Sequence, residues 1–327
     1  MAPGSPLLAP GSCESPSERL RATIGIKRRL SQLAHDMAQL ALRLPNNAAG
    51  DFFVDSSCID CDACRQIAPT VFRDEGDQSV VFHQPESDEE RLATQKALIS
   101  CPTASIGTVT KEDMRAAVAS LPDLIDENVY RCGYTSESSF GAFSYLIRRD
   151  GGNVLVDSPR FANPLVKNIE RLGGIGRIVL THQDDVADHE KFHRHFGADR
   201  VLHRDDVRSR TAGVELQPAG REPLSLDAGL LMIPTPGHTK GHAVFLDRNR
   251  FLFTGDHLAW DVEDQRLYAF RNACWYSWAE QIESMKRLLD YEFEWVLPGH
   301  GRPVHLPAAR MHAELERCVA WMSATSG

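Results

Sequence analysis

Three cysteines stand at equal spacing in the stretch CIDCDAC, and a fourth is followed by proline in CPTASI. The three are Cys58, Cys61 and Cys64, and the remote one is Cys101. Three thiolates with two-residue gaps can wrap one corner of an iron–sulfur cube, while a distant Cys-Pro supplies the last ligand. Structural zinc sites usually show paired CxxC knuckles, which fit this spacing poorly. The sequence therefore predicts one [4Fe-4S] cluster, held by these four cysteines.

Histidines and aspartates follow predicted strands in four other segments, VLTHQDD, PTPGHTKGH, LFTGDH and VLPGHG. Imidazole and carboxylate groups on loops at one edge of a sheet sandwich can converge on zinc, iron or manganese. Glycines beside them let the backbone turn sharply enough to aim each side chain. Each segment alone would be a common turn or helix cap, but four in this order predict a site for one or two metal ions.

The cysteine region resembles a known family. VDSSCIDCDACRQIAPTVF, with the later CPTASI, is similar to single-cluster bacterial-type ferredoxins across most of residues 51–108. The resemblance implies a small α+β electron-transfer module with the four cysteines as cluster ligands. The remaining cysteines lie outside the pattern and are expected to be unpaired thiols: Cys13, Cys132, Cys274 and Cys318.

The histidine and aspartate segments resemble the metallo-β-lactamase fold family from Val129 to His305, including the strand in NVLVDSP. This resemblance implies an αββα sandwich. It also implies His238, Asp256 and His300 as metal ligands, with Asp256 as the bridging carboxylate of the catalytic site. Together the two resemblances imply a ferredoxin module followed by a metallo-β-lactamase-like sandwich, a pairing similar to that of uncharacterised proteins of cyanobacteria and plants.

The opening motif departs from the family pattern T-H-x-H-x-D-H, because the chain reads THQDDVADH from residue 181 to 189. If the motif is anchored on its first Thr-His, His182 is the first ligand and Asp184 replaces the second histidine. If it is anchored on the downstream helix, Asp184 is the motif aspartate and Asp185 replaces the last histidine. Anchoring on Asp188-His189 recovers the Asp-His pair instead. We predict His182 and Asp184 as ligands and keep Asp185 and His189 as candidates.

A simpler explanation exists for these acids, because Asp184 or Asp185 could cap the following helix and complement its dipole. If the carboxylates are ligands, they favour iron or manganese, although zinc also fits. A carboxylate at this motif is also similar to flavodiiron proteins, whose di-iron centre receives electrons from a fused flavin module. In this chain a ferredoxin takes the place of that module.

Three functions follow from these patterns. In a metal-dependent hydrolase, a bound water acquires a pKa near 7 and Asp188 acts as base. In an oxidoreductase, the ferredoxin feeds electrons to a non-haem iron site. In a docking module, the altered motif binds no metal. The hydrolase is the leading prediction, acting on a small molecule, with the ferredoxin transferring electrons or sensing redox state.

Composition supports a folded, acidic protein. The chain has 327 residues, 42% hydrophobic and 25% charged, and a net charge of -9. Residues 51–90 hold eleven acids against two arginines, so this segment carries the net charge. The absence of an extended basic face argues against nucleic-acid binding. The acidic face suits a basic redox protein partner, and no apolar run in the sequence is long enough to span a membrane.

The elements that must position these residues follow from periodicity. We expect a disordered start and a basic amphipathic helix within 1–50, the ferredoxin module over 51–110, a helical connector over 111–128 and the sandwich over 129–327. The basic helix fits either a targeting peptide or an ordinary helix that packs on a neighbour. Together with the resemblance to cyanobacterial and plant proteins, it favours a plastid location, with the cytoplasm as the alternative. Within the sandwich, strands alternate with helices near 163–172, 186–196 and 279–291, and a helix closes the chain.

Overall fold

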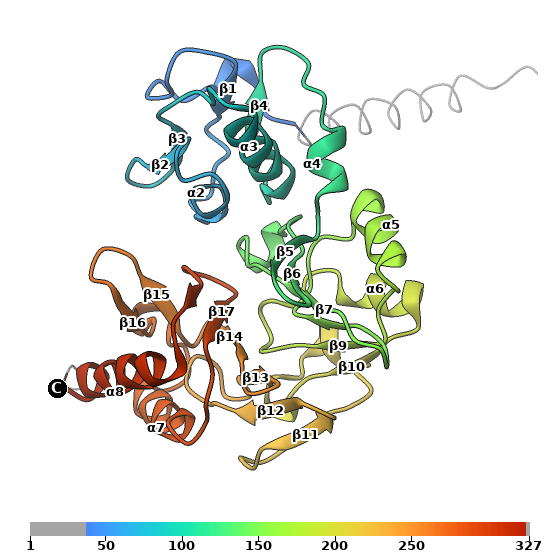
Figure 1. The fold of residues 1–327 in the computed structure, drawn as a ribbon, viewed down its shortest axis with the longest axis vertical. Coiled ribbons are helices and arrows are strands. Elements are labelled where there is room, and N and C mark those ends of the chain that lie inside the picture. Colours follow the sequence, from blue (N-terminus) through green and yellow to red (C-terminus); the bar gives the residue numbers. More distant parts are fainter. Residues whose placement is uncertain (1–36, 325–327) are drawn as a thin grey trace, which may run out of the picture.

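The computed structural model describes residues 37–324, and Figure 1 shows a small module beside a larger two-sheet body. The basic helix predicted near the start falls mainly on residues outside that range. Its predicted end contains a short 3-10 helix, η1 (Leu40–Leu42), rather than an α-helix. Gln39, just before it, is extended and donates its N–H to Asp55 Oδ2 at 2.7 Å, and Arg43, just after it, forms a β-bridge with Asp55. This segment therefore packs on the ferredoxin module.

The ferredoxin module consists of two short antiparallel pairs and two helices. Its elements are β1 (Phe52–Val54), α2 (Ala63–Ile67), β2 (Phe72–Asp74), β3 (Ser79–Val81), α3 (Asp88–Ser100) and β4 (Ile106–Thr108), with β1 paired to β4 and β2 to β3. Helix α3 begins where the Ser87 hydroxyl accepts a hydrogen bond from Glu90 N. It ends before Cys101-Pro102, since proline cannot continue a helix. This end fixes the position of the remote cysteine.

The larger body contains two six-stranded sheets. The first has the order β10-β9-β8-β7-β6-β5, with β5 (Asp123–Asp126), β6 (Val129–Arg131), β7 (Tyr145–Ile147), β8 (Val154–Val156), β9 (Arg177–Val179) and β10 (Asp199–Val201). The second has the order β11-β12-β13-β14-β17-β18, with β11 (Leu224–Asp227), β12 (Leu230–Pro234), β13 (Ala243–Asp247), β14 (Phe251–Gly255), β17 (Trp295–Pro298) and β18 (Val304–His305).

Four layers arise from alternation along the strands. In β7, Tyr145 and Ile147 pack between the two sheets, while Leu146 packs on the opposite face. Helices α5 (Asn163–Arg171) and α6 (His189–Phe196) cover that outer face, and Leu165 and Phe192 join its core. Helices α7 (Trp278–Leu288) and α8 (Ala308–Ala324) cover the other sheet. This arrangement is the predicted αββα sandwich.

The remaining elements connect or extend the layers. Helix α4 (Arg115–Ala119) lies in the predicted connector, but β5 in the same stretch joins the first sheet. The hairpin β15 (Ala259–Asp261) and β16 (Arg266–Tyr268) was not predicted. Short turns make up the rest: η2 (Glu137–Ser139), η3 (Arg204–Asp206), η4 (Ser209–Thr211) and η5 (Arg271–Ala273). Across residues 37–324, no helix combines the length and apolarity needed to cross a membrane.

Candidate metal centre

The predicted ligands gather at one edge of the sandwich because each follows a strand that ends there. His182 comes after β9, His238 after β12, Asp256 directly after β14 and His300 after β17. Gly255, the last residue of β14, has φ +48°, and a Cβ there would lie 2.5 Å from Thr181 Oγ1. Glycine is therefore required where the second sheet approaches the first, just before Asp256.

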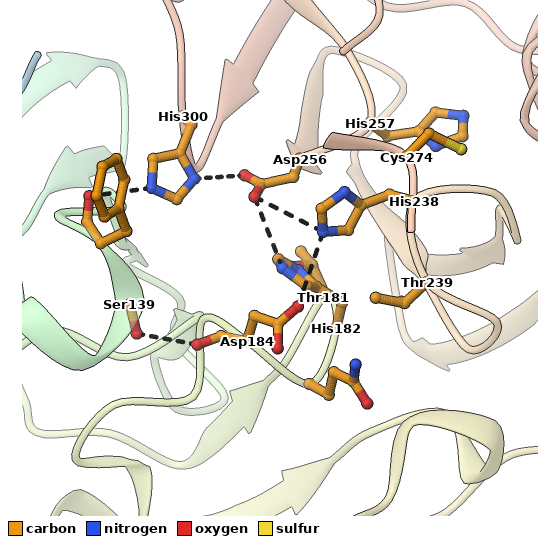
Figure 2. A network of polar contacts seen from close by, with 12 residues as sticks. Ser139, Thr181, His182, Asp184, His238, Thr239, Asp256, His257, Cys274 and His300 are labelled. Carbon is orange, nitrogen blue, oxygen red and sulfur yellow. Dashed lines mark hydrogen bonds and ion pairs between the residues drawn. The ribbon is translucent and has the colours of Figure 1, made fainter. Parts of the chain in front are cut away.

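Two groups of ligand atoms share His182. One consists of His182, Asp184 and His238, and the other of His182, Asp185 and Asp256, with the ligand atoms of each group within 4.8 Å of one another. Asp256 Oδ2 lies 3.8 Å from both His182 Nε2 and His238 Nε2, and Figure 2 shows these side chains pointing toward one another. The structure thus brings Asp184 to one ligand group and Asp185 to the other.

These atoms fit a metal ion. Separations of 3.8 Å are too long for hydrogen bonds, but shorter than two metal–ligand bonds of about 2.1 Å laid end to end. His182 Nε2, His238 Nε2 and Asp185 Oδ2 are buried and have no hydrogen-bond partner within the described part of the chain. Burial lowers the pKa of His182 to about 3, which keeps the imidazole neutral, the form that binds metal.

Thr181 sets the tautomer of His182. Its Oγ1 lies 2.9 Å from Asp157 Oδ2 and 2.9 Å from His182 Nδ1. A carboxylate only accepts, so the Thr181 hydroxyl donates to Asp157 and accepts from the Nδ1–H of His182. The lone pair of Nε2 is then directed at the ligand group. Asp157 has φ +56°, an uncommon conformation that the buried contact with Thr181 holds in place.

We expect Thr181→Val to weaken metal binding by about 10–100-fold, because the partner that orients His182 is lost. Metal titration of the apoprotein measures this effect. Thr235→Val is the matched control, since the Thr235 hydroxyl lies 2.9 Å from Nδ1 of His242, which belongs to neither ligand group. Equal losses in both variants would show that a buried hydroxyl matters here only for folding.

His300 holds Asp256 rather than joining either group. Its Nδ1 lies 2.7 Å from Asp256 Oδ1, and its Nε2 lies 3.3 Å from the Phe140 carbonyl oxygen. Burial alone would lower the pKa of His300, but the Asp256 carboxylate raises it to about 10. Asp256 in turn has its pKa lowered by His300, against the effect of burial. In this arrangement Asp256 is ionised and oriented by His300.

Asp185 is a buried acid that makes no ion pair with a lysine or arginine among the described residues, and the nearby His300 only partly offsets its burial. Burial raises its pKa well above the usual range, and the neighbouring Asp256 raises it further. A Cβ on Gly299 would lie 2.6 Å from Asp185 Oδ2 and 3.2 Å from Asp256 Oδ1. Glycine at this position therefore leaves room for two carboxylates to face each other, which is the charge pattern that attracts a divalent ion.

Asp188 and His189 lie apart from these groups. Asp188 Oδ2 accepts a hydrogen bond from Phe161 N at 2.8 Å, and its Oδ1 lies 2.8 Å from Lys191 Nζ. His189 is buried beside Arg200, which together with burial lowers its pKa to about 4. Helix α6 begins at His189, so neither Asp184 nor Asp185 caps it. The structure thus gives Asp188 and His189 other contacts and leaves the ligands in the stretch from 182 to 185.

Two further histidines line the inner side of the site. His242 and His257 are buried and stacked, with ring centroids 5.2 Å apart, and His242 is 5.3 Å from His182. Burial lowers the pKa of His242 well below its usual range and that of His257 to about 3. Both rings are therefore neutral and form a wall behind the candidate ligands. In the sequence, His242 lies four residues after His238 and His257 directly follows Asp256, and this spacing could have indicated the role.

The four cluster cysteines converge on one small cavity. Ser79 N points at Cys58 Sγ at 3.5 Å, and Ser105 N points at Cys101 Sγ at 3.3 Å. Burial raises the pKa of Cys61 to about 12. Buried thiols grouped around backbone N–H donors match the environment of an iron–sulfur cluster, in which iron deprotonates the thiols and the N–H groups tune its potential.

The cluster cavity adjoins a larger one, which the two domains enclose together. This cavity has a volume of about 830 Å³. One wall contains Cys61, Asp62 and Arg65 of the ferredoxin module. The opposite wall contains ligand candidates and aromatic side chains: Asp184, Asp185, His238, Asp256, His300, Phe140, Tyr268, Phe270 and Trp275. The side chain of Trp275 is 68% exposed and its ring lies 6.3 Å from that of His238.

Comparison with known proteins agrees with both parts. Residues 54–108 match the family described as the 4Fe-4S single cluster domain of Ferredoxin I. The uncharacterised protein YobT of Bacillus subtilis is 27% identical over 206 residues, covering 53% of this chain and 88% of YobT. The uncharacterised protein YmaE of the same organism is 29% identical over 140 residues, covering 41% of this chain and 51% of YmaE.

Among solved structures, the DIM-1 metallo-β-lactamase exposed to ceftazidime matches with a TM-score of 0.50 and 18% sequence identity, covering 62% of this chain and 96% of that one. The identity is low enough that the match concerns the fold. The predicted architecture is thereby confirmed: a single-cluster ferredoxin module is fused to a domain with the metallo-β-lactamase fold.

Proposed function

We propose that the chain is an oxidoreductase in which the ferredoxin module supplies electrons to a non-haem iron site that acts on a small molecule. One observation carries the proposal: a cluster cysteine, Cys61, and the ligand candidates Asp184 and Asp256 line the same cavity of about 830 Å³. A cluster that only senses redox state or stabilises the fold would not need to face the cavity in which a substrate binds. This choice reverses the order of the sequence prediction, in which hydrolysis led.

The ligand set supports iron at this site. It comprises two imidazoles, His182 and His238, and three carboxylates, Asp184, Asp185 and Asp256. Such an oxygen-rich set favours iron or manganese over zinc. When bound, the ion supplies the change of redox state and an open position for the substrate. The protein residues orient these ligands, and His300 keeps Asp256 ionised and in place.

The aromatic wall would bind the substrate and exclude water. Trp275 is fixed through its backbone, because Trp275 N donates to His238 O at 2.9 Å. Its exposed ring, together with Phe140 and Phe270, presents flat apolar surfaces next to the ligands. A cavity of this size and lining suits a drug-sized organic molecule rather than a polymer. Electrons would enter from a basic redox protein at the acidic ferredoxin face.

Hydrolysis is the second candidate, favoured by the fold that the chain shares with a metallo-β-lactamase. The predicted mechanism assigned Asp188 as base. Asp188 does not line the cavity, and its carboxylate is held by Phe161 N and Lys191. A hydrolase would therefore need another base from the same cavity. In hydrolysis, moreover, a cluster cysteine that faces this cavity would have no chemical role.

Electron counting tests the proposal. We expect anaerobic dithionite titration of the purified protein to take up more than the roughly one electron per chain that a single [4Fe-4S] cluster accepts. The excess arises because iron in the second site is also reduced. His182→Ala, which removes the residue common to both ligand groups, should return the uptake to that of the cluster alone. Uptake limited to the cluster in the unmodified protein, with zinc in the second site, would favour hydrolysis instead.

A further inference from the structure

We propose that Gly141, Phe140 and His300 form the electron route between the cluster cysteine Cys61 and the metal-site carboxylate Asp256. The inference rests on the proposed oxidoreductase function and assigns a role to three residues that the sequence patterns did not connect. The route runs from Cys61 across a packed contact to Gly141, along one peptide unit to the Phe140 carbonyl, and through two hydrogen bonds of the His300 ring.

The first step is a contact without space for a side chain. A Cβ on Gly141 would lie 2.6 Å from Cys61 Cβ and 2.7 Å from Cys61 Sγ. It would also lie 3.4 Å from Pro102, the residue after the ligand Cys101. The backbone of the sandwich domain is therefore pressed directly against two ligand segments of the cluster, and glycine is the residue that permits the approach.

The second step depends on an uncommon backbone conformation. Phe140 has φ 45° and ψ 30°, and Gly141 follows with φ +83°. Two successive left-handed residues reverse the chain sharply, and a bulky residue rarely adopts this conformation. The turn places the Phe140 carbonyl oxygen 3.3 Å from His300 Nε2. The rings of Phe140 and His300 also lie close, with centroids 6.1 Å apart. Strain of this kind concentrates at functional sites.

The third step connects the His300 ring to the metal-site carboxylate Asp256. His300 Nδ1 lies 2.7 Å from Asp256 Oδ1, and the other oxygen of Asp256 faces His182 and His238. His300 therefore touches the turn at Phe140 with one nitrogen and a ligand carboxylate with the other. Covalent bonds and hydrogen bonds of 3.3 and 2.7 Å connect Cys61 to Asp256, except at the packed contact with Gly141.

Separate contacts fix the distance between the two domains. Arg302, two residues after His300, places Nη2 at 3.3 Å from Asp62 Oδ1, next to Cys61. On the other side, Thr135 donates its hydroxyl to the carbonyl oxygen of Ser100 at 2.6 Å, and Ser100 precedes Cys101. Both ends of the cysteine set are thus tied to the loops that flank the route, so the packed contact is held in place.

The electron balance is simple. A one-electron donor, such as dithionite or a reduced low-potential redox protein, would reduce the cluster held by the four cysteines from the 2+ to the 1+ state. The cluster would return to 2+ when one ferric ion held by the second site is reduced to ferrous. Neither step would form or break a bond, and neither would need a proton for balance.

The experiment follows one electron after flash photoreduction of the anaerobic, fully metallated protein. Bleaching of the cluster absorption reports arrival of the electron, and its recovery reports transfer to the second iron. We expect His300→Leu to bleach normally and to recover about 10–100-fold more slowly, the range typical of losing a group hydrogen-bonded to a metal ligand. His305→Leu is the matched control, because it removes a nearby histidine whose ring stacks on Trp295, with centroids 4.6 Å apart, and touches neither the turn at Phe140 nor Asp256.

A second pair of variants covers the case in which His300→Leu loses the second metal. Gly141→Ala forces Cys61 away from the turn and should slow recovery, whereas Gly133→Ala should not. Gly133 also has a positive φ, +64°, but its Cβ would meet Ser100 Oγ and Leu121 instead of a cysteine. Recovery at the unmodified rate in both route variants would overturn the route and leave the oxidoreductase proposal standing. The absence of recovery in the unmodified protein would overturn the oxidoreductase proposal itself.

Discussion

His182→Ala should remove all metal beyond the roughly four irons of the cluster, because His182 Nε2 belongs to both ligand groups. The measurement is elemental analysis of anaerobically purified protein. Loss of a ligand shared by two groups is expected to empty both, whereas loss of a ligand from one group should empty that group alone. Asp184→Ala and His238→Ala should affect the first group, and Asp185→Ala the second.

His189→Ala is the matched control for this result. His189 is also a buried histidine of the same motif, but its contact is with Arg200 and it contributes to neither ligand group. It should keep the metal content of the unmodified protein. If His182→Ala keeps the extra metal as well, the ligand assignment fails. If His189→Ala loses it while His182→Ala does not, the alternative motif register anchored on the Asp-His pair is the correct one.

Cys58→Ser should lose the cluster and loosen the ferredoxin module while leaving the sandwich domain folded. The module has a small core around Phe52, Phe72 and Val81, and binding of a metal group to thiolates contributes directly to the folding of such domains. Three further hydrophobic cores lie mainly in the sandwich, and Ala63 of the ferredoxin module joins one of them. Iron analysis should show a loss of about four atoms, and limited proteolysis should cut within residues 51–110 before it cuts elsewhere.

Cys274→Ser provides the comparison. Cys274 Sγ donates to Gly237 O at 3.2 Å, a hydrogen bond that a serine hydroxyl can also make. This variant should retain the cluster and the protease resistance of the module. A cluster that survives in Cys58→Ser would contradict the assignment of the four cysteines. Digestion of the whole chain in that variant would show that the two domains do not fold independently.

The sequence predicted what depends on local spacing. The cysteine set and the candidate positions His238 and Asp256 follow from short motifs at strand ends, so one chain segment carries each signal. The same kind of motif predicted His300 as a ligand, whereas in the structure His300 belongs to neither ligand group and holds Asp256. The register of the motif between 181 and 189 depends instead on where helix α6 begins. It begins at His189 rather than near 186, because residues 183–188 form turns that carry Asp184 and Asp185 to the site.

Contacts between segments far apart in the sequence could not be predicted, because no single stretch of residues carries a signal for them. Phe140 reads as an ordinary loop residue, and nothing near it in the sequence reveals that its carbonyl approaches His300, 160 positions away. The hairpin β15–β16 consists of two three-residue strands, too short for a period of two to be detected. The packing of Cys61 against Gly141 likewise arises only when both domains are folded.

Residues of both domains form the wall of the large cavity. Cys61, Asp62 and Arg65 of the ferredoxin module face the same space as the candidate ligands Asp184, Asp185 and Asp256. On the proposed function, exchanging the module for another ferredoxin would change the electron source and the shape of the substrate space together. Substitution of Asp62 or Arg65 would then alter the choice of substrate without touching a candidate ligand of the second site.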